Sequence, residues 1–392
     1  MKTTLALITG VAVLTACQDV QAPQAPQALP PPPNAAVTSV QTDAAGTQIV
    51  IGETGPGSVY ALYKPANWND KLVLFAHGAV PPTVPVRLPP VPLRDSILAR
   101  GYAFAYSSRS ETGFAVKDGV QRTRQLRGLF ASAFGEPVRT YMIGGSLGGE
   151  IALMLVEKNP ELLDGALLAA APVGGSLMEF DYVYNVRVLY DYFFPGVIPG
   201  DALHVSTDRG SDEAILAAVA VSLRANPARA IELAGVDQVD IHYANFGELV
   251  NAIVGVLTPQ LNFTNDILDR TQRHSFFDNT HTRYTGSLDD AAVNAGVDRF
   301  ASTRDAEDHW DHYYEPDGRL TVPLLTLHNA RDFFVPLAHE AFYGDLVASQ
   351  GASVRLVQRT FNQFGHGVGI GQQVRAFDEL VQWVEADVRP VP

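Results

Sequence analysis

The 392-residue sequence has one cysteine, Cys17, and no clustered run of Lys or Arg. A single cysteine cannot form an internal disulfide, so the fold depends on its core for stability. The net charge is −14, from 42 acidic and 28 basic residues. Phosphate binding needs clustered cations, which excludes nucleic acid as a partner. No motif recurs with a period of about 20 to 50 residues, which excludes solenoids and propellers.

The N-terminal 40 residues differ in composition from the rest of the chain. Lys2 is followed by the apolar run 5–14 and then by Leu-Thr-Ala-Cys at 14–17, which predicts a signal peptide over residues 1–16. The Leu-Thr-Ala-Cys sequence resembles a bacterial lipobox. That resemblance implies a lipid on Cys17 and an exported protein anchored to the bacterial cell envelope, outside the cytoplasm. The alternative is a plain secreted protein with a free thiol. Residues 17–40, rich in Pro, Gln and Ala, are expected to form an extended tether.

Of all 392 residues, 46% are hydrophobic and 18% are charged, a composition that suffices for a large core. Strand patterns alternate with helix patterns and predict an α/β fold with a mostly parallel sheet and helices on both faces. The expected strands are 47–52, 58–64, 71–75, 102–106, 138–143, 165–171, 320–327 and 353–357, and the expected core helices are 93–100, 117–134, 150–157 and 372–388.

The alternation stops between residues 172 and 319, where helical patterns dominate at 212–224, 227–234, 248–257 and 291–301. This excess of chain between two strands predicts an inserted, mainly helical cap over 175–317. The core is then expected to comprise 41–174 and 318–392.

Ser146 lies in Gly-Gly-Ser-Leu-Gly at 144–148, between an expected buried strand and an apolar helix. A serine in this strand–turn–helix context is a candidate nucleophile, because the sharp turn exposes its hydroxyl at a helix N-terminus. The alternative is a glycine-rich turn with an incidental serine.

A serine hydroxyl needs a base and an orienting carboxylate to react at neutral pH. Asp332 follows the expected strand 320–327, and His366 lies between glycines after the last strand. Carboxyl ends of parallel strands meet at one sheet edge, so Ser146, Asp332 and His366 are expected to converge there as a catalytic triad.

With these motifs the chain resembles the α/β-hydrolase superfamily, whose members carry Ser, Asp and His in this order. It also looks like a bacterial branch of capped, secreted esterase-like or loosely prolyl-oligopeptidase-like hydrolases. The resemblance implies an oxyanion hole made by the backbone N–H groups of Leu147 and Ala79, with Gly78 as the near alternative to Ala79. His77 is expected to pack the loop. Asn329 stands where glycine is common in the family.

An aromatic cluster opens the cap and includes Tyr182, Tyr184 and Tyr190. These side chains either line an apolar substrate pocket or pack the cap, and both interpretations stay open. The Asp-His-Trp-Asp-His sequence at 308–312 has metal-binding residue types, but a further ligand is not evident. We favour a hinge between cap and core packed by Trp310, and expect neither metal nor cofactor.

The sequence therefore predicts a serine hydrolase that cleaves small-molecule carboxylic esters through an acyl-enzyme. A capped serine peptidase or aminopeptidase is the alternative, which would need an acidic site for the amine, with Glu150, Glu179 and Asp181 as candidates. A non-catalytic lipoprotein that binds ligands in a hydrolase-like pocket is a third possibility.

Overall fold

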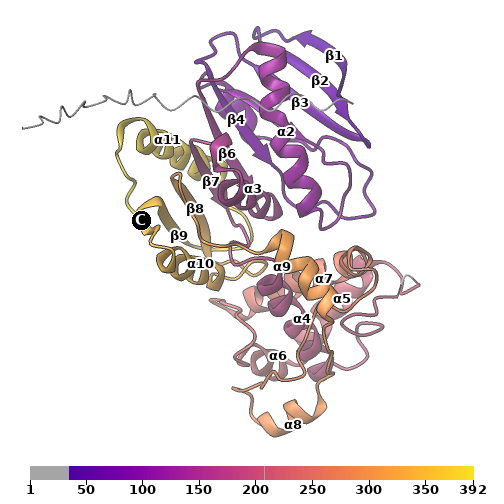
Figure 1. Cartoon of the computed structure of the whole chain (residues 1–392). Helices are drawn as coiled ribbons and strands as arrows, with labels where there is room; N and C mark the ends of the chain where they lie inside the picture. The colour runs from indigo at the N-terminus through magenta and orange to yellow at the C-terminus, as the bar shows by residue number, and fades with distance from the viewer. Residues whose placement is uncertain (1–34, 207) are drawn as a thin grey trace, which may run out of the picture.

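The computed structural model describes residues 35–206 and 208–392, so Cys17, the expected signal peptide and most of the expected tether lie outside the described residues. In the described ranges one sheet runs through the upper part of the molecule, and a group of helices lies below it (Figure 1). The strands are β1 (Ala36–Thr42), β2 (Gln48–Thr54), β3 (Ser58–Lys64), β4 (Lys71–Ala76), β5 (Ala103–Ser107), β6 (Arg139–Gly145), β7 (Gly165–Ala169), β8 (Leu324–Arg331) and β9 (Leu356–Phe364).

The strand order is β1-β2-β3-β5-β4-β6-β7-β8-β9. The first three strands pair antiparallel with each other and β3 pairs antiparallel with β5, whereas every pair from β5 to β9 is parallel. The prediction of a mostly parallel α/β sheet is thus confirmed.

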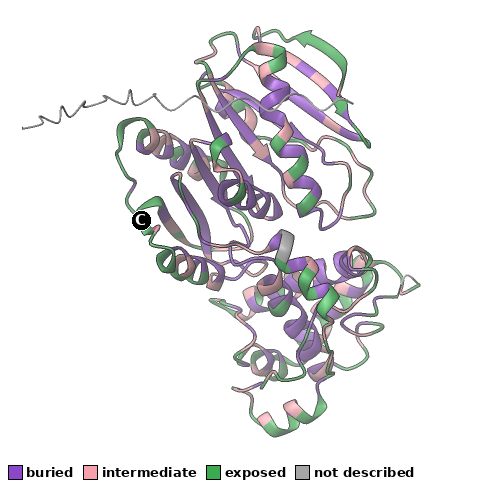
Figure 2. Cartoon of the chain, viewed as in Figure 1, coloured by how far each residue is buried: buried purple, intermediate pink, exposed green. Residues whose placement is uncertain are grey.

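Helices cover both faces of this sheet. On one face lie α1 (Leu93–Leu98) and α11 (Ile370–Ala386), and on the other lie α2 (Val116–Phe134), α3 (Leu147–Lys158) and α10 (Ala338–Ser349). Successive strand residues point to opposite faces, so Leu72 and Leu74 pack in one apolar cluster and Val73 in the other. The parallel strands β4 to β8 are consequently buried on both faces, as Figure 2 shows, whereas most residues of the edge strand β9 are intermediate or exposed.

The largest differences from the expected strand boundaries occur at three strands. β1 lies partly in the stretch assigned to the tether, because Ala36–Thr42 contains β-branched residues and pairs with β2 along its edge. β8 begins at Leu324 rather than at 320, directly after Pro323, which has no N–H to donate to a ladder. Residues Ser353–Arg355 form a 3-10 turn, and β9 follows them.

The segment between β7 and β8 contains the helices below the sheet, which we call the cap. They are α4 (Ser176–Phe193), α5 (Asp212–Ala225), α6 (Pro227–Ala234), α7 (Phe246–Arg270), α8 (Asp290–Gly296) and α9 (Arg304–Tyr314). Side-chain oxygens of Ser211, Asn245 and Thr303 cap α5, α7 and α9. The expected helix at 291–301 ends early, at Gly296.

The cap packs against the core through aromatic rings and hydrogen bonds. Phe114, in the loop before α2, contacts Phe180 of α4 and Trp310 of α9, with ring centroids 5.0 and 5.9 Å apart. The Phe114 N–H donates to the Asp266 carboxylate of α7 at 2.6 Å. The cap is therefore seated on the core close to the loops that follow the strands.

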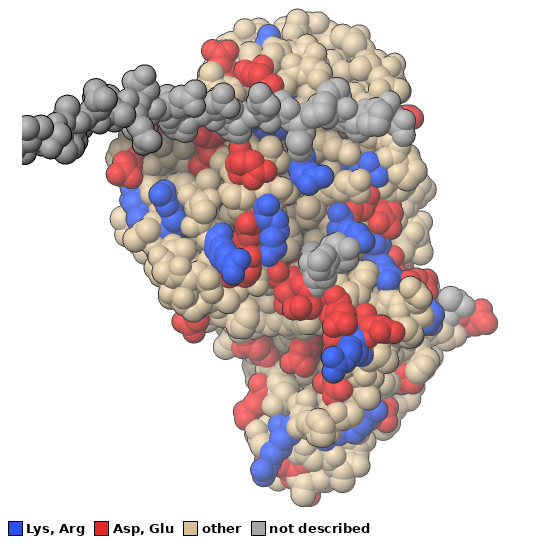
Figure 3. All heavy atoms as spheres, in the orientation of Figure 1, with Lys and Arg blue, Asp and Glu red and all other residues tan. Residues whose placement is uncertain are grey.

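Lys and Arg side chains stand among Asp and Glu on the face in Figure 3, in keeping with the net charge of −14. Within 35–206 and 208–392, no single helix has the length and apolarity to cross a membrane, and the bent pair α5–α6 meets those criteria by length and composition only.

Candidate active site

Ser146 occupies the tight turn between β6 and α3. Its backbone has φ 54° and ψ −133°, in the left-handed half of the map that costs a non-glycine residue energy. A Cβ on Gly144 would lie 2.2 Å from the Gly148 carbonyl oxygen, and a Cβ on Gly148 would lie 2.1 Å from the Ala76 carbonyl oxygen. Both glycines are thus required by close backbone approach, which explains the sequence pattern around Ser146.

The three residues expected to form a triad meet at this turn. His366 Nε2 lies 2.9 Å from Ser146 Oγ, and His366 Nδ1 lies 2.9 Å from Asp332 Oδ2. Asp332 is buried, and its Oδ1 accepts the N–H groups of Phe334 and Val335 at 2.9 and 3.1 Å. A carboxylate at Nδ1 favours the tautomer with its proton there, so the lone pair of Nε2 faces the serine hydroxyl.

The loop that carries His366 is held by Asn329. Gly365 and Gly367, on either side of the histidine, have φ 106° and 96°, which a residue with a Cβ rarely adopts. The Asn329 amide donates to both of their carbonyl oxygens, at 2.9 and 2.8 Å. Phe334 stacks on the imidazole with centroids 4.7 Å apart. Asn329 therefore positions the base, a role that the sequence alone did not indicate.

A second histidine lies behind the acid. The buried His328 Nε2 is 2.9 Å from the Val335 carbonyl oxygen and 3.8 Å from Asp332 Oδ2, and its Nδ1 is 3.3 Å from Glu340 Oε1. Both ring nitrogens face acceptors. Burial alone would lower the pKa of His328, but the hydrogen bond and charge of Glu340 and the charge of Asp332 outweigh burial and raise it.

The loop after β4 lies directly beside the nucleophile. A Cβ on Gly78 would lie 3.3 Å from Ser146 Cβ, and the next residue, Ala79, lines a cavity together with Ser146 and Leu147. Leu147 is the first residue of α3, where helical N–H groups lack intrahelical acceptors. The two residues expected to supply the oxyanion donors, Leu147 and Ala79, therefore line the same cavity as Ser146.

The side chain of Arg109 holds this loop in place. Its buried guanidinium donates to the carbonyl oxygens of His77 and Gly78, at 3.3 and 3.0 Å. Burial and the Arg109 charge lower the pKa of His77 to about 3, so the His77 ring is neutral. Fixing these two carbonyls also fixes the peptide planes that aim the following N–H groups.

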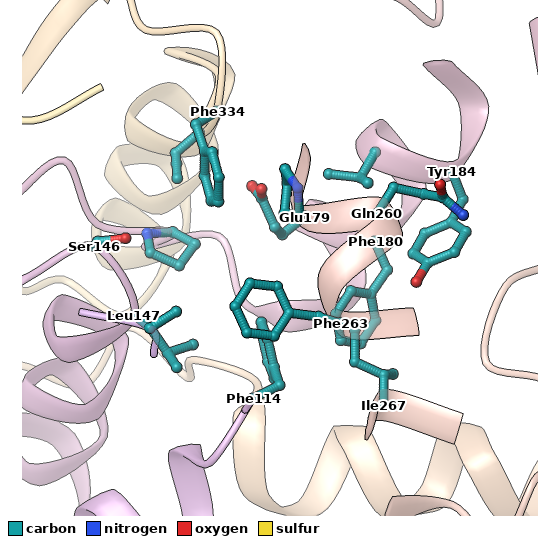
Figure 4. A pocket seen from close by; sticks show the side chains of 15 residues that line it. Phe114, Ser146, Leu147, Glu179, Phe180, Tyr184, Gln260, Phe263, Ile267 and Phe334 are labelled. Atoms are coloured by element: carbon teal, nitrogen blue, oxygen red, sulfur yellow. The ribbon is translucent and has the colours of Figure 1, made fainter. Parts of the chain in front are cut away.

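An apolar cavity leads from Ser146 into the cap (Figure 4). Its cap wall comes from α4 and α7, including Phe180, Val183, Tyr184, Phe263 and Ile267, and the polar side chains of Glu179 and Gln260 also line it.

Of the three tyrosines considered for this pocket, only Tyr184 lines the cavity. Tyr182 donates its hydroxyl to the Phe333 carbonyl oxygen at 2.8 Å, and the Tyr190 hydroxyl meets Ser222 of α5 at 2.7 Å. Tyr182 thus joins α4 to the core loop after β8, and Tyr190 packs within the cap.

Across the described ranges, no group of three or more His, Cys, Asp or Glu side chains is arranged to hold a metal ion. Trp310 is buried between Phe114 and Phe180, its ring 4.9 Å from that of Phe180. This placement accords with packing between cap and core at 308–312.

No family model and no curated protein sequence matches this chain. Solved structures do match it. Feruloyl esterase B from Aspergillus oryzae is 14% identical with a TM-score of 0.54, over 91% of this chain and 88% of that one. An esterase from the same organism has 13% identity, a TM-score of 0.49 and the same coverages. Candida antarctica lipase A has 12% identity and a TM-score of 0.49, over 91% and 82%. The sheet order and the first of these similarities together show that the chain has the fold of the α/β-hydrolase superfamily.

Proposed function

We propose that the protein is a serine hydrolase that cleaves small-molecule carboxylic esters through an acyl-enzyme. The observation that carries this proposal is the chain of hydrogen bonds from Ser146 Oγ through His366 to Asp332, 2.9 Å at each step. Ser146 also lines an apolar cavity, in which the carbonyl group of a substrate could lie next to Oγ.

In the proposed reaction, Ser146 Oγ attacks the ester carbonyl while His366 Nε2 takes the hydroxyl proton. The N–H groups of Leu147 and Ala79 stabilise the negative oxygen of the tetrahedral intermediate. His366 then gives the proton to the leaving alcohol oxygen, and the acyl group stays on Ser146. Water repeats the sequence with His366 as base and releases the acid.

The cavity favours an ester over a peptide substrate. An aminopeptidase needs an ionised carboxylate for the amine, whereas burial raises the pKa of Glu179, the acid in the cavity, well above its ordinary value. The raised pKa disfavours the ionised form of Glu179, which is the form that an ammonium group would need as a counter-charge. Feruloyl esterase B, which shares the fold, is by its name an esterase, and this supports the same choice.

The test is active-site labelling combined with ester hydrolysis. A fluorophosphonate should modify Ser146, and Ser146→Ala and His366→Ala should each lower the turnover of 4-nitrophenyl butanoate by about 10³-fold or more. Ser132→Ala, at a serine on α2 that bonds only within its own helix, is the control. Wild-type turnover by a folded Ser146→Ala protein, or an adduct on another serine, would reject the proposal.

We also propose that the protein is exported and anchored to the cell envelope by a lipid on Cys17. The support is the apolar run 5–14 and Leu-Thr-Ala-Cys at 14–17. Cells grown with labelled palmitate should incorporate the label into the wild-type protein but not into Cys17→Ser. Equal, unlabelled secretion of both proteins would contradict the anchor.

A further inference from the structure

Glu179 stands out in the cavity because it is a buried carboxyl without a well-formed hydrogen bond. Its side chain on α4 is 5% exposed, and neither carboxyl oxygen has a partner of acceptable geometry. In Figure 4 the carboxyl lies between the Ser146 end of the cavity and Gln260, with its oxygens directed toward Phe334. A buried polar group that lacks a partner in the protein calls for an explanation.

The neighbour that comes closest is His339. Its Nε2 lies 3.1 Å from Glu179 Oε2, but the N–H direction is too far off line to form a good hydrogen bond. His339 Nδ1 accepts the Gly174 N–H at 3.0 Å, which puts the ring proton on Nε2. Burial and the nearby charge of His328 lower the pKa of His339 to about 3, so this ring is neutral. His339 therefore supplies no positive charge to Glu179; the charges of His366 and His328 act on the carboxyl but do not outweigh its burial.

Besides Glu179, the polar cap side chains that line the cavity are Tyr184 and Gln260, and both are already satisfied; the Tyr184 hydroxyl meets Thr264 Oγ1 at 2.9 Å. Gln260 accepts from Arg187 at 2.8 Å through Oε1 and donates to the Ala202 carbonyl oxygen at 2.9 Å through Nε2. Around Glu179 the cavity is walled by Phe114, Phe180 and Phe334. Glu179 is thus a polar group that is free to bind within an apolar wall, close to the serine.

We infer that Glu179 is a specificity-determining residue that binds a hydroxyl group of the ester substrate. A neutral carboxyl can accept from and donate to a hydroxyl, and the aromatic walls accommodate the carbon atoms around it. This inference rests on the proposed esterase function and deepens it. The substrate class is hydroxylated carboxylic esters, with the hydroxyl on the part that enters the cavity.

The test compares esters that differ only in a hydroxyl and a methyl group of similar size. 4-Nitrophenyl esters with a hydroxyl on the second or third acyl carbon are each paired with the methyl analogue. Propyl and 2-hydroxyethyl butanoate place the same change on the alcohol side. In at least one pair, wild-type protein should favour the hydroxylated ester by about 10-fold in kcat/KM, the effect of one buried hydrogen bond.

Two substitutions at Glu179 separate binding of a neutral group from binding of a cation. Glu179→Gln keeps an acceptor and a donor without the acid, so it should retain the preference, whereas Glu179→Leu should abolish or invert it. Asp181→Asn, at an exposed carboxylate on the same helix and outside the cavity lining, should leave the preference unchanged. Fluorophosphonate labelling of Ser146 reports whether each variant remains folded.

Several outcomes would overturn the inference. Equal rates within every pair for the wild type, or the same preference in Glu179→Leu, would show that Glu179 does not bind the hydroxyl. Preference for a 3-aminobutanoyl ester that is lost in Glu179→Gln would assign an ammonium site instead. If no ester is hydrolysed and Ser146 is not labelled, the proposed function itself fails, which is a distinct result.

Discussion

The core and the cap contribute different kinds of residues to the site. Ser146, Asp332 and His366 all lie in loops that follow core strands, where the backbone fixes their positions through strained turns and N–H bonds. The cap contributes side chains such as Phe180 and Phe263 from the faces of helices. In the proposed esterase, the reaction would thus depend on backbone geometry in the core, whereas the choice of substrate would depend on replaceable side chains in the cap.

This comparison implies that a substitution in the core should alter the rate for all esters together. A substitution in the cap should alter the ratio of rates among esters. The predictions below test that difference.

Outside the triad, the largest effect is expected at Arg109, which does not line the cavity but holds the carbonyls of His77 and Gly78. Arg109→Met should lower kcat by up to about 10²-fold for every ester, because the Ala79 N–H would no longer be held in the direction of the oxyanion. KM should change little.

The control for Arg109 is Arg122→Met, which removes another buried arginine, one paired with Asp118 on its own helix. A comparable loss of kcat there, or a loss at Arg109 that varies from ester to ester, would show that Arg109 does not act through the oxyanion loop.

A smaller effect is expected in the cap wall. Phe263→Ala enlarges the cavity, so the octanoate-to-acetate ratio of kcat/KM should rise by about 5-fold, the effect of roughly 1 kcal/mol of added apolar contact. The rate of fluorophosphonate labelling should stay within about 2-fold of the wild type, since labelling reports the core residues.

Phe277→Ala is the matched control for Phe263, because Phe277 is buried in the cap outside the cavity lining. It should destabilise the protein by about 3 kcal/mol, as large-to-small core changes do, without changing the octanoate-to-acetate ratio. A change of ratio in Phe277→Ala would mean that general loosening of the cap sets the selectivity.

The core was more predictable than the cap for a physical reason. The glycines around Ser146 and the strand before Asp332 are local signals of geometry, and the order of Ser, Asp and His restricts the topology. In contrast, the sequence of α4 indicates an aromatic cluster but not a helix. Its residues are buried on nearly every side, so they show no clear helical period.

Apart from the convergence of Ser146, Asp332 and His366, the contacts between distant segments could not be predicted from the sequence. Asn329 and Arg109 act on loops that are 36 and 31 positions away, at Gly365 and Gly78, and no local pattern marks either pairing. Glu179 was one of three candidate acids, and only the face on which α4 meets the core places it in the cavity.

A further effect, on stability rather than on rate, is expected at the junction where the chain passes from core to cap and back. Glu315 Oε1 accepts the Leu177 N–H at 2.8 Å, which ties the end of α9 to the first turn of α4, and burial raises the pKa of Glu315 to about 8. In an unfolded chain a glutamate has a pKa near 4.3, so folding takes up a proton between these values. The contribution of Glu315 to the free energy of unfolding should accordingly fall as pH rises from about 5 to 8, by at most about 1.4 kcal/mol per pH unit.

Urea unfolding at pH 5.5 and 8.0 measures this change. The free energy of unfolding should decrease less for Glu315→Gln than for wild type, while Glu307→Gln, at an exposed position on α9, should show the same decrease as wild type. An unchanged slope in Glu315→Gln would show that this carboxyl is ionised in the folded protein, and the junction between core and cap would then not respond to pH through Glu315.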